Sequence, residues 1–245
     1  MSLRGTGTAF ISIGLACQAS LQLYRNRQHL SSLVGEPLEY RSSFFNWLMV
    51  SADEIPRLLE RMTAPIEAGS IGLPAGVKVP VLLGYRAWLF HDGPTSKVTR
   101  KKFRQLVAKY EHLRQNFLDL CSRRTRHFVL CNAQNNLATE HPHLSDGMAI
   151  DFDDKLIGET RAAVDRLFPA GRNRLLVVGR SDRLERPMRR RVRVPAADAT
   201  LWEGDTAAWT AVLSRHLASR RADKKSGRAA ASGARSRSVS APLAG

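Results

Sequence analysis

The chain has 245 residues, of which 43% are hydrophobic and 24% charged, and its formal net charge is +16. This length exceeds the size below which a core needs disulfides or metals to fold. Its three cysteines are widely spaced and include no CxxC pair, so neither a disulfide framework nor a zinc knuckle is predicted. No apolar run of 18 residues is present, so we expect no membrane span. Free cysteines favour a reducing, cytoplasmic location.

The positive charge is partly concentrated at the end of the sequence. Residues 220–245 contain seven basic residues and one acidic residue, a net charge of +6, in a Ser/Ala/Gly-rich composition. This segment lacks the apolar residues that a core requires, so we expect a disordered basic tail. Residues 1–219 are expected to form a single α/β domain. The tail predicts weak, salt-sensitive contact with nucleic acid or other polyanions.

The first predicted elements form a strand, a glycine turn and a helix. Residues 8–13 are apolar and β-branched, and helical composition follows from Cys17 to Leu30. The same stretch could be read as a short lipoprotein signal ending at Cys17, but it has one arginine and Gly14 interrupts it. A phosphate-binding loop is disfavoured because the turn has one glycine and no lysine. The sequence therefore predicts no cofactor.

Strands and helices alternate along the rest of the domain. A helix is predicted within 51–62, a hairpin over 77–83 and 85–90, helices over 97–121, 157–168 and 202–217, and strands over 127–131, 174–178 and 191–194. This alternation predicts a three-layer α/β fold, with a central mixed or mostly parallel sheet and helices on both faces. An α+β papain-like arrangement is the alternative.

Two residues are candidates for chemistry. Cys17 is predicted at the N-terminus of a helix, where unpaired N–H groups and the helix dipole favour a thiolate. The alternative for Cys17 is a small buried hydrophobic residue. His91 follows a predicted strand and precedes an Asp-Gly-Pro turn, and its alternative is an exposed loop histidine. Asp92, its neighbour, is expected to point elsewhere.

Several short motifs in this order resemble a bacterial domain family described as papain-like cysteine peptidases. The family carries Ser-Leu-Gly-x-x-Cys, then Pro-Phe-Asp-Trp, then His-Asp-Phe, and later Trp-x-Gly-Asp. The corresponding segments here are 12–17, 44–47, 91–93 and 202–205, so the resemblance covers roughly residues 8–215. It implies that Cys17 is the nucleophile, that His91 is the base, and that an amide or ester bond is the substrate.

The chain departs from the family pattern at two of these motifs. Ser43 or Phe44 stands where the family has proline, Asn46 where it has aspartate, and Gly93 where it has phenylalanine. Loss of a functional aspartate would weaken the activity, whereas an amide can accept the Nδ1–H bond of the histidine, as in papain-type enzymes. Asn46 and Asn132, which follows a predicted strand, are therefore the two candidates for orienting His91.

Two further hypotheses come from other residues. His141 and His143 lie near several aspartates, but no third ligand has a recognised spacing, so a polar loop is favoured over a metal site. The rival to the hydrolase is a non-catalytic binding module that holds a polyanion or acidic partner through its basic residues. These include Arg100, Lys101, Lys102, Arg104 and the run of arginines at 189–191.

Overall fold

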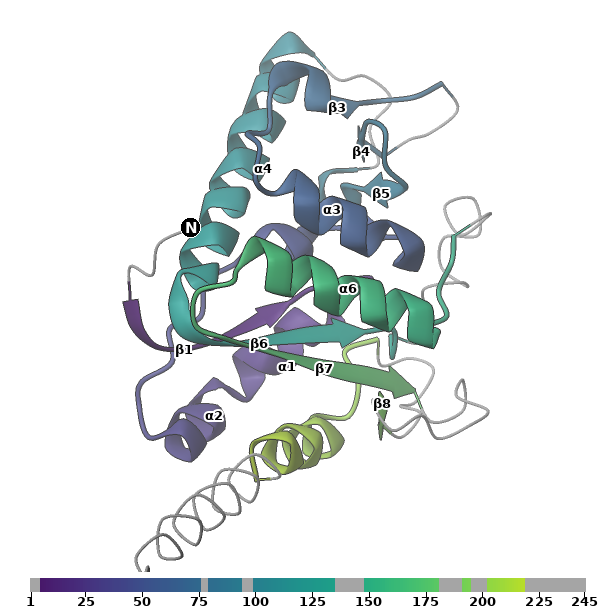
Figure 1. Cartoon of the computed structure of the whole chain (residues 1–245). Coiled ribbons are helices and arrows are strands. Elements are labelled where there is room, and N and C mark those ends of the chain that lie inside the picture. Colours follow the sequence, from purple (N-terminus) through teal and green to yellow (C-terminus); the bar gives the residue numbers. More distant parts are fainter. Residues whose placement is uncertain are drawn as a thin grey trace, which may run out of the picture.

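Four parallel strands form the main sheet of the computed structural model, which describes residues 5–75, 79–93, 99–134, 148–180, 191–194 and 202–218. Their order is β1 (Gly5–Ser12), β6 (Arg123–Cys131), β7 (Arg172–Arg180) and β8 (Arg191–Val194). Every neighbouring pair is parallel, so the carboxyl ends of all four strands lie at one edge of the sheet. This edge is on the right in Figure 1.

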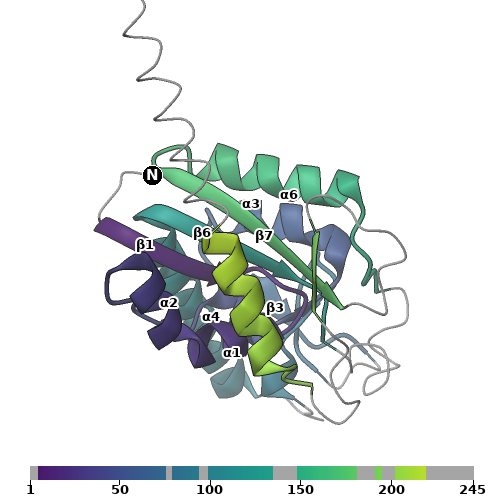
Figure 2. The same cartoon turned by 90° about the horizontal axis from the view of Figure 1, so that it is seen from below.

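Helices cover both faces of this sheet. α1 (Gln18–Arg25), α2 (Arg27–Val34) and a helix at 206–218 lie on one face, as Figure 2 shows. α3 (Ile55–Arg61), α4 (Arg100–Cys121) and α6 (Asp154–Leu167) lie on the other (Figure 1). The predicted three-layer α/β fold is confirmed. The sequence predicts a mixed or mostly parallel sheet, and every pair of neighbouring strands in the main sheet is parallel.

Side-chain alternation along β6 explains why both faces are covered. Phe128 and Leu130 belong to the core on the α4 and α6 side, whereas Val129 and Cys131 belong to the core on the α1 side. Successive strand residues point to opposite faces, so an uninterrupted apolar run needs helices on both. The apolar sequence from 128 to 131 therefore marks a strand buried between two layers.

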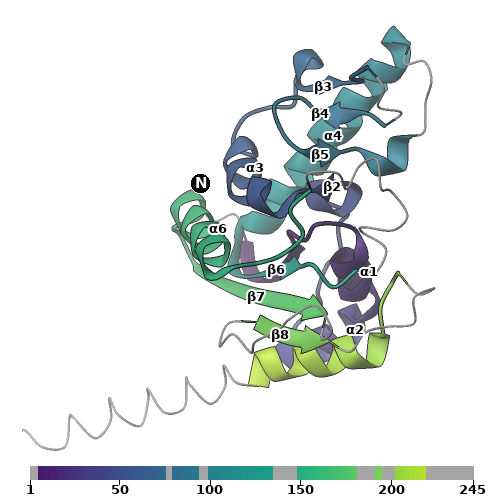
Figure 3. The ribbon, with the colours of Figure 1, turned by 90° about the vertical axis from the view of Figure 1, so that its right-hand side faces the viewer.

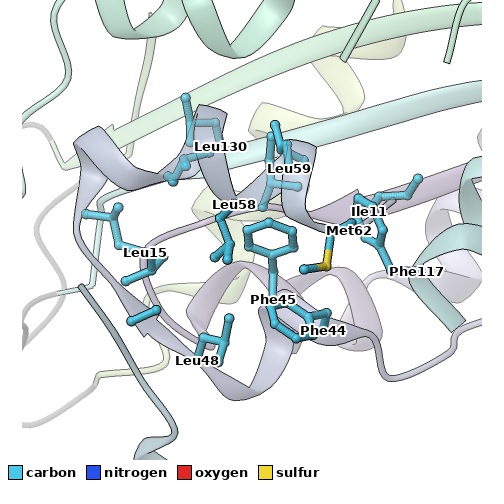
Figure 4. Packing of buried hydrophobic residues seen from close by; sticks show 14 of the residues in the cluster. Ile11, Leu15, Phe44, Phe45, Leu48, Leu58, Leu59, Met62, Phe117 and Leu130 are labelled. Atoms are coloured by element: carbon cyan, nitrogen blue, oxygen red, sulfur yellow. The ribbon is translucent and has the colours of Figure 1, made fainter. Parts of the chain in front are cut away.

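The larger core lies between the sheet and helices α3, α4 and α6. Buried residues of α4, including Tyr110 and Phe117, pack against the 3-10 helix η1 (Phe44–Trp47). Figure 4 shows Phe45 of η1 at the centre of this core, beside Leu58 and Met62 of the α3 segment. Burial of Phe44 and Phe45 therefore anchors η1, and this anchor positions the residues next to it.

A second, small antiparallel sheet has the order β2 (Met49–Val50), β5 (Ala87–Trp88), β4 (Val81–Leu82) and β3 (Ile71–Gly72). The predicted hairpin is confirmed as β4 and β5, with Gly84 at φ +81 in its turn. Met49 pairs with Trp88. Since the strands are antiparallel, η1, which precedes β2, lies beside η4 (Phe90–Asp92), which follows β5. Two other 3-10 helices are η2 (Ala52–Glu54) and η3 (Ala68–Ser70).

The first helix differs from its prediction. The single helix expected from Cys17 to Leu30 is divided at Asn26 into α1 and α2. The amide of Asn26 donates to the carbonyl of Gln22 at 2.9 Å and accepts from the Thr210 hydroxyl at 2.6 Å. Its side chain thus caps α1 and ties it to the last helix, a contact that the local sequence does not reveal.

Two further expectations concern the C-terminal tail and membrane-spanning helices. The predicted basic tail at 220–245 lies outside the described residues. Within the described part of the chain, no helix combines the length and apolar character needed to cross a membrane.

Candidate active site

A pocket of about 320 Å³ begins at Cys17, beside the carboxyl-end edge of the main sheet, and extends along α1 to Tyr24. This edge is where parallel α/β proteins usually bind their ligands. Three of the four predicted site residues, Cys17, Asn46 and His91, line it together. The complete lining is Cys17, Ser20, Leu21, Tyr24, Tyr40, Ser42, Asn46, Trp47, His91 and Trp202.

Cys17 is placed by the turn that leaves β1. Ile13 and Leu15 continue to donate to the carbonyls of Val129 and Cys131, at 2.9 and 3.0 Å, so the turn stays against β6. At Gly14 a Cβ atom would lie 3.1 Å from the Cys131 carbonyl oxygen, which explains the need for glycine there. Cys17 then forms the N-cap of α1, as predicted.

The thiol of Cys17 lies beside a residue that the sequence did not single out. Its Sγ is 4.0 Å from Oε1 of Gln134, and the same oxygen accepts from the backbone N–H of Gln18 at 3.3 Å. Gln134 follows β6, the strand next to β1, so both residues come from carboxyl ends of adjacent strands. A polar residue just after the strand next to β1 is the sequence feature that could have indicated Gln134.

The expected thiolate character of Cys17 is not found in this geometry. Burial raises the pKa of the Cys17 thiol to about 11, although a hydrogen bond from its backbone acts in the opposite direction. The loss of hydration around the sulfur outweighs the effect of the helix N-terminus. Cys17 is therefore a neutral thiol at neutral pH.

His91 belongs to η4 and lines the same pocket as Cys17. Its ring packs edge-on against Trp47, with the ring centres 5.3 Å apart, and against Phe90 at 5.8 Å. Partial burial, together with the nearby Lys109 ammonium, lowers the pKa of His91, while Asp92 raises it less. The imidazole is therefore neutral near pH 7, as a general base must be.

Asp92 is held away from this imidazole, in agreement with the sequence prediction. Its carboxylate accepts two hydrogen bonds from the Lys109 ammonium, at 2.8 and 2.9 Å, and one from the Tyr110 hydroxyl at 2.9 Å. The Lys109 nitrogen also lies 4.2 Å from the ring centre of Trp47. The cluster of Asp92, Lys109 and Tyr110 therefore fixes η4 and the indole on which His91 packs.

The two candidate amides lie in different surroundings. Asn46 Nδ2 donates to the Tyr40 hydroxyl oxygen at 3.3 Å, and Asn46 Oδ1 accepts from Ser43 at 3.3 Å. Asn132 is buried, donates to the carbonyl of Ile150 at 2.9 Å and is not among the residues that line the pocket. Only Asn46 shares a cavity with Cys17 and His91, and its amide is bound to Tyr40 rather than to the imidazole.

Trp202 enters the pocket from a segment far along the chain. The Trp202 carbonyl accepts from the Gln18 side chain at 2.7 Å, and the Glu203 carbonyl accepts from Gln22 at 2.7 Å. Gly204 has φ +80, and a Cβ there would lie 3.0 Å from the Gln18 amide. Asp205 caps the helix at 206–218 by accepting from Ala208 N–H at 2.8 Å. Residues 202–205 thus dock the last helix on α1.

No metal centre is formed by the described residues, among which no three His, Cys, Asp or Glu side chains are grouped to hold an ion. His141 and His143, considered as ligands from the sequence, lie outside those residues.

No family model, curated protein or solved structure matches this chain. The resemblance to the papain-like family therefore rests on the short motifs at 12–17, 44–47, 91–93 and 202–205.

Proposed function

We propose that this protein is a cysteine-dependent hydrolase or acyltransferase that acts on an amide or ester bond, with Cys17 as nucleophile and His91 as base. One observation carries the proposal: these two residues, predicted separately from the sequence, line the same pocket. Nucleophilic acyl transfer requires at least a nucleophile and a base, and a thiol and an imidazole that share a cavity can supply both.

The chemical step begins from a neutral pair. His91 takes the proton of the Cys17 thiol as the sulfur attacks the carbonyl carbon, which forms a C–S bond and a tetrahedral oxyanion. Collapse of this intermediate breaks the bond to the leaving group, which receives the proton from the imidazolium. Water, activated by His91, then hydrolyses the thioester, or another nucleophile accepts the acyl group.

The pKa directions favour proton transfer during attack over a resting thiolate–imidazolium pair. The Cys17 pKa of about 11 and the lowered His91 pKa both keep the resting pair uncharged. Binding of substrate in place of water is then the event that brings the two groups into reaction. This differs from papain-type enzymes, in which the cysteine is already acidic.

Hydrogen-bond donors for the oxyanion are available at two sides of the pocket. The first turn of α1 has N–H groups without helical partners. That of Gln18 donates to Gln134 Oε1 at 3.3 Å and would exchange this partner for the oxyanion. The Tyr40 hydroxyl accepts a hydrogen bond from Asn46, so its own proton can be donated, either to the neighbouring Ser20 side chain or to an oxyanion in the cavity. In this proposal Asn46 positions Tyr40, which gives the asparagine a function in the place where the family has aspartate.

The direct test is acylation by p-nitrophenyl acetate, followed as a burst of p-nitrophenol. We expect Cys17→Ala to abolish the burst and His91→Ala to slow it by about 10²-fold or more, the range of general-base catalysis. His112→Ala is the matched control, since His112 is an exposed histidine that does not line the pocket. An unchanged burst rate in His91→Ala would remove His91 from the mechanism.

The histidine variant decides this question better than a comparison of the three thiols. Cys121 and Cys131 are buried, whereas Cys17 is partly accessible. Cys17 therefore reacts first with any thiol reagent, whether or not it is catalytic. The presence of three free cysteines also supports our proposal of a cytoplasmic location.

The second candidate function, a polyanion-binding module, is favoured by the first turns of α4. Arg100, Lys101, Lys102 and Arg104 are exposed, and none forms an ion pair with a carboxylate in the described part of the chain. For this function, affinity for a single-stranded oligonucleotide should fall steeply between 50 and 200 mM salt, because released counterions oppose binding. It should also survive Cys17→Ala. Absence of binding at low salt would dismiss it.

A further inference from the structure

The pocket beside Cys17 has aromatic, uncharged walls. Its larger side chains are Leu21, Tyr24, Tyr40, Trp47 and Trp202, and no described residue that lines it is an aspartate, glutamate, lysine or arginine. This is unusual for the surface of a chain with a net charge of +16. A charged ligand would lose hydration here without gaining a charged partner.

Exposure of the tyrosines gives independent support for a binding surface. In the described residues, the large hydrophobic side chains that remain exposed are Tyr24, at 44%, Tyr40, at 37%, and Leu83, at 46%. Two of these three line the same pocket, where their rings pack edge to face with centres 5.0 Å apart. Single exposed apolar residues are ordinary, whereas a cluster of them beside reactive groups marks a site for a ligand.

Cations already occupy two of these aromatic rings. The Arg27 guanidinium lies 4.4 Å from the ring centre of Tyr24, and the Lys109 ammonium lies 4.2 Å from that of Trp47. The attraction of a ring for a cation comes from its π electrons, which these side chains already use. A positively charged ligand therefore gains little further cation–π attraction from these two rings, and Lys109 is itself neutralised by Asp92.

The carboxylates next to the lining residues are also engaged. Asp92, adjacent to His91, is paired with Lys109 at 2.8 Å, and Glu203, adjacent to Trp202, is paired with Arg25 at 3.6 Å. Glu39, adjacent to Tyr40, is paired with Arg41 at 2.6 Å. None of the three is available to attract a cationic group. The electrostatic surroundings thus disfavour a quaternary ammonium or lysine-like substrate, which an aromatic pocket would otherwise suit.

We propose that this pocket binds an uncharged planar ring, so that the substrate is an aryl or arylacyl amide or ester whose carbonyl lies beside Cys17. A cavity of about 150 Å³ holds benzene in another protein, so about 320 Å³ has room for a ring and the reacting group. The assignment of this ring to a substrate depends on the proposed function, but binding of the ring does not.

Binding is tested in Cys17→Ala, which removes the nucleophile, with three small amides. Phenylacetamide, betaine amide and malonamate share the acetamide unit and present a neutral ring, a cation and an anion. We expect saturable quenching of tryptophan fluorescence by phenylacetamide, with at least tenfold weaker binding of the other two. Equal or tighter binding of either charged amide, or no saturable binding of phenylacetamide, would overturn the proposal.

Three further variants test whether phenylacetamide binds in this pocket and why a cation does not. Tyr24→Leu should weaken phenylacetamide binding severalfold, whereas Leu83→Ala, which changes an exposed apolar residue outside the pocket, should leave it unchanged. Arg27→Gln should improve binding of betaine amide relative to phenylacetamide, because it removes a cation from the Tyr24 ring. If phenylacetamide binds as expected while wild-type Cys17 forms no acyl-enzyme, the ring pocket stands and the proposed hydrolase fails.

Discussion

Two cavities of the same volume, about 320 Å³ each, have opposite chemistry: one begins at Cys17, which follows the carboxyl end of β1, and the other lies at the amino end of β1. The one at the carboxyl end combines a thiol, an imidazole and aromatic rings. The one at the amino end is lined by Gly7, Thr8, Glu36, Arg124, Thr125 and Arg172 and contains no nucleophile paired with a base. The two cavities are therefore distinguished by the side chains that line them and not by their volume.

The amino end of the sheet has a structural function instead. Arg126 is buried there, and its guanidinium donates to the carbonyls of Cys121, Phe168 and Ala170 and to the Asn173 side chain. These acceptors lie where α4 and α6 end and β6 and β7 begin. One arginine thus joins four segments at the end of the sheet opposite Cys17. Figure 3, viewed from the carboxyl-end side, shows α1 beside the strand ends where the candidate chemistry lies.

The largest expected effect concerns the ionisation of Cys17. With a thiol pKa of about 11, roughly one molecule in ten thousand is ionised at pH 7. Alkylation of Cys17 by iodoacetamide, followed by mass spectrometry, should therefore rise about tenfold per pH unit from pH 7 to 10. A plateau reached by about pH 9.5 would show an ordinary thiol, and one at lower pH an acidic thiol. N-acetylcysteine amide, which should level off near its ordinary pKa of about 8.5, is the control.

The next largest effect is expected on the free energy of unfolding, for variants at the amino end of the main sheet. Arg126→Met keeps an apolar chain but leaves several buried carbonyls without a donor, so the free energy of unfolding should fall by about 3 kcal/mol or more. Arg124→Met, at the same end of the sheet but exposed, should change it by less than about 0.5 kcal/mol. Chemical denaturation measures both. Equal effects of the two variants would contradict the structural function given to Arg126.

A smaller effect is expected where the last helix docks at the carboxyl end. Gly204→Ala places a Cβ in the left-handed region, at a cost of about 1 to 2 kcal/mol, and brings it 3.0 Å from the Gln18 amide. Stability should fall by that amount. The acylation burst should also slow, since Trp202 lines the pocket. Gly35→Ala is a suitable control: Gly35 is also left-handed, at φ +80, but a Cβ there meets nothing within 4 Å. It should cost stability without changing the burst.

The layers of the fold were predictable because each rests on local pattern. The apolar run at 128–131 predicts a strand covered on both faces, and the stripe that includes Tyr110 and Phe117 predicts α4. Cys17 was placed at a helix start because a strand, a glycine and a helical segment follow one another. His91 could also be predicted as a candidate base, because it follows the strand that contains β5.

The surroundings of the site were not predictable, because they depend on contacts between distant segments. The pairing of Met49 with Trp88 brings Trp47 beside His91, and the parallel pairing of β1 with β6 brings Gln134 to Cys17. The thiol pKa went against the sequence expectation for the same reason. A helix N-terminus is visible in the sequence, whereas the burial that opposes it is not.

The smallest expected effect tests whether the charge cluster beside the pocket tunes the base. Lys109→Met removes the ammonium that lowers the pKa of His91 and releases Asp92, whose carboxylate raises it. Both changes raise the pKa of the imidazole, so less of the base is neutral at a given acidic pH. The acid limb of the acylation rate should therefore move to higher pH, with a loss of less than about tenfold at pH 6 and little change at pH 8. Loss of packing against Trp47 alone would lower the rate equally at every pH, so the shape of the profile distinguishes the two. A profile that keeps its midpoint would mean that Lys109 contributes to the structure of η4 and not to the proton affinity of His91.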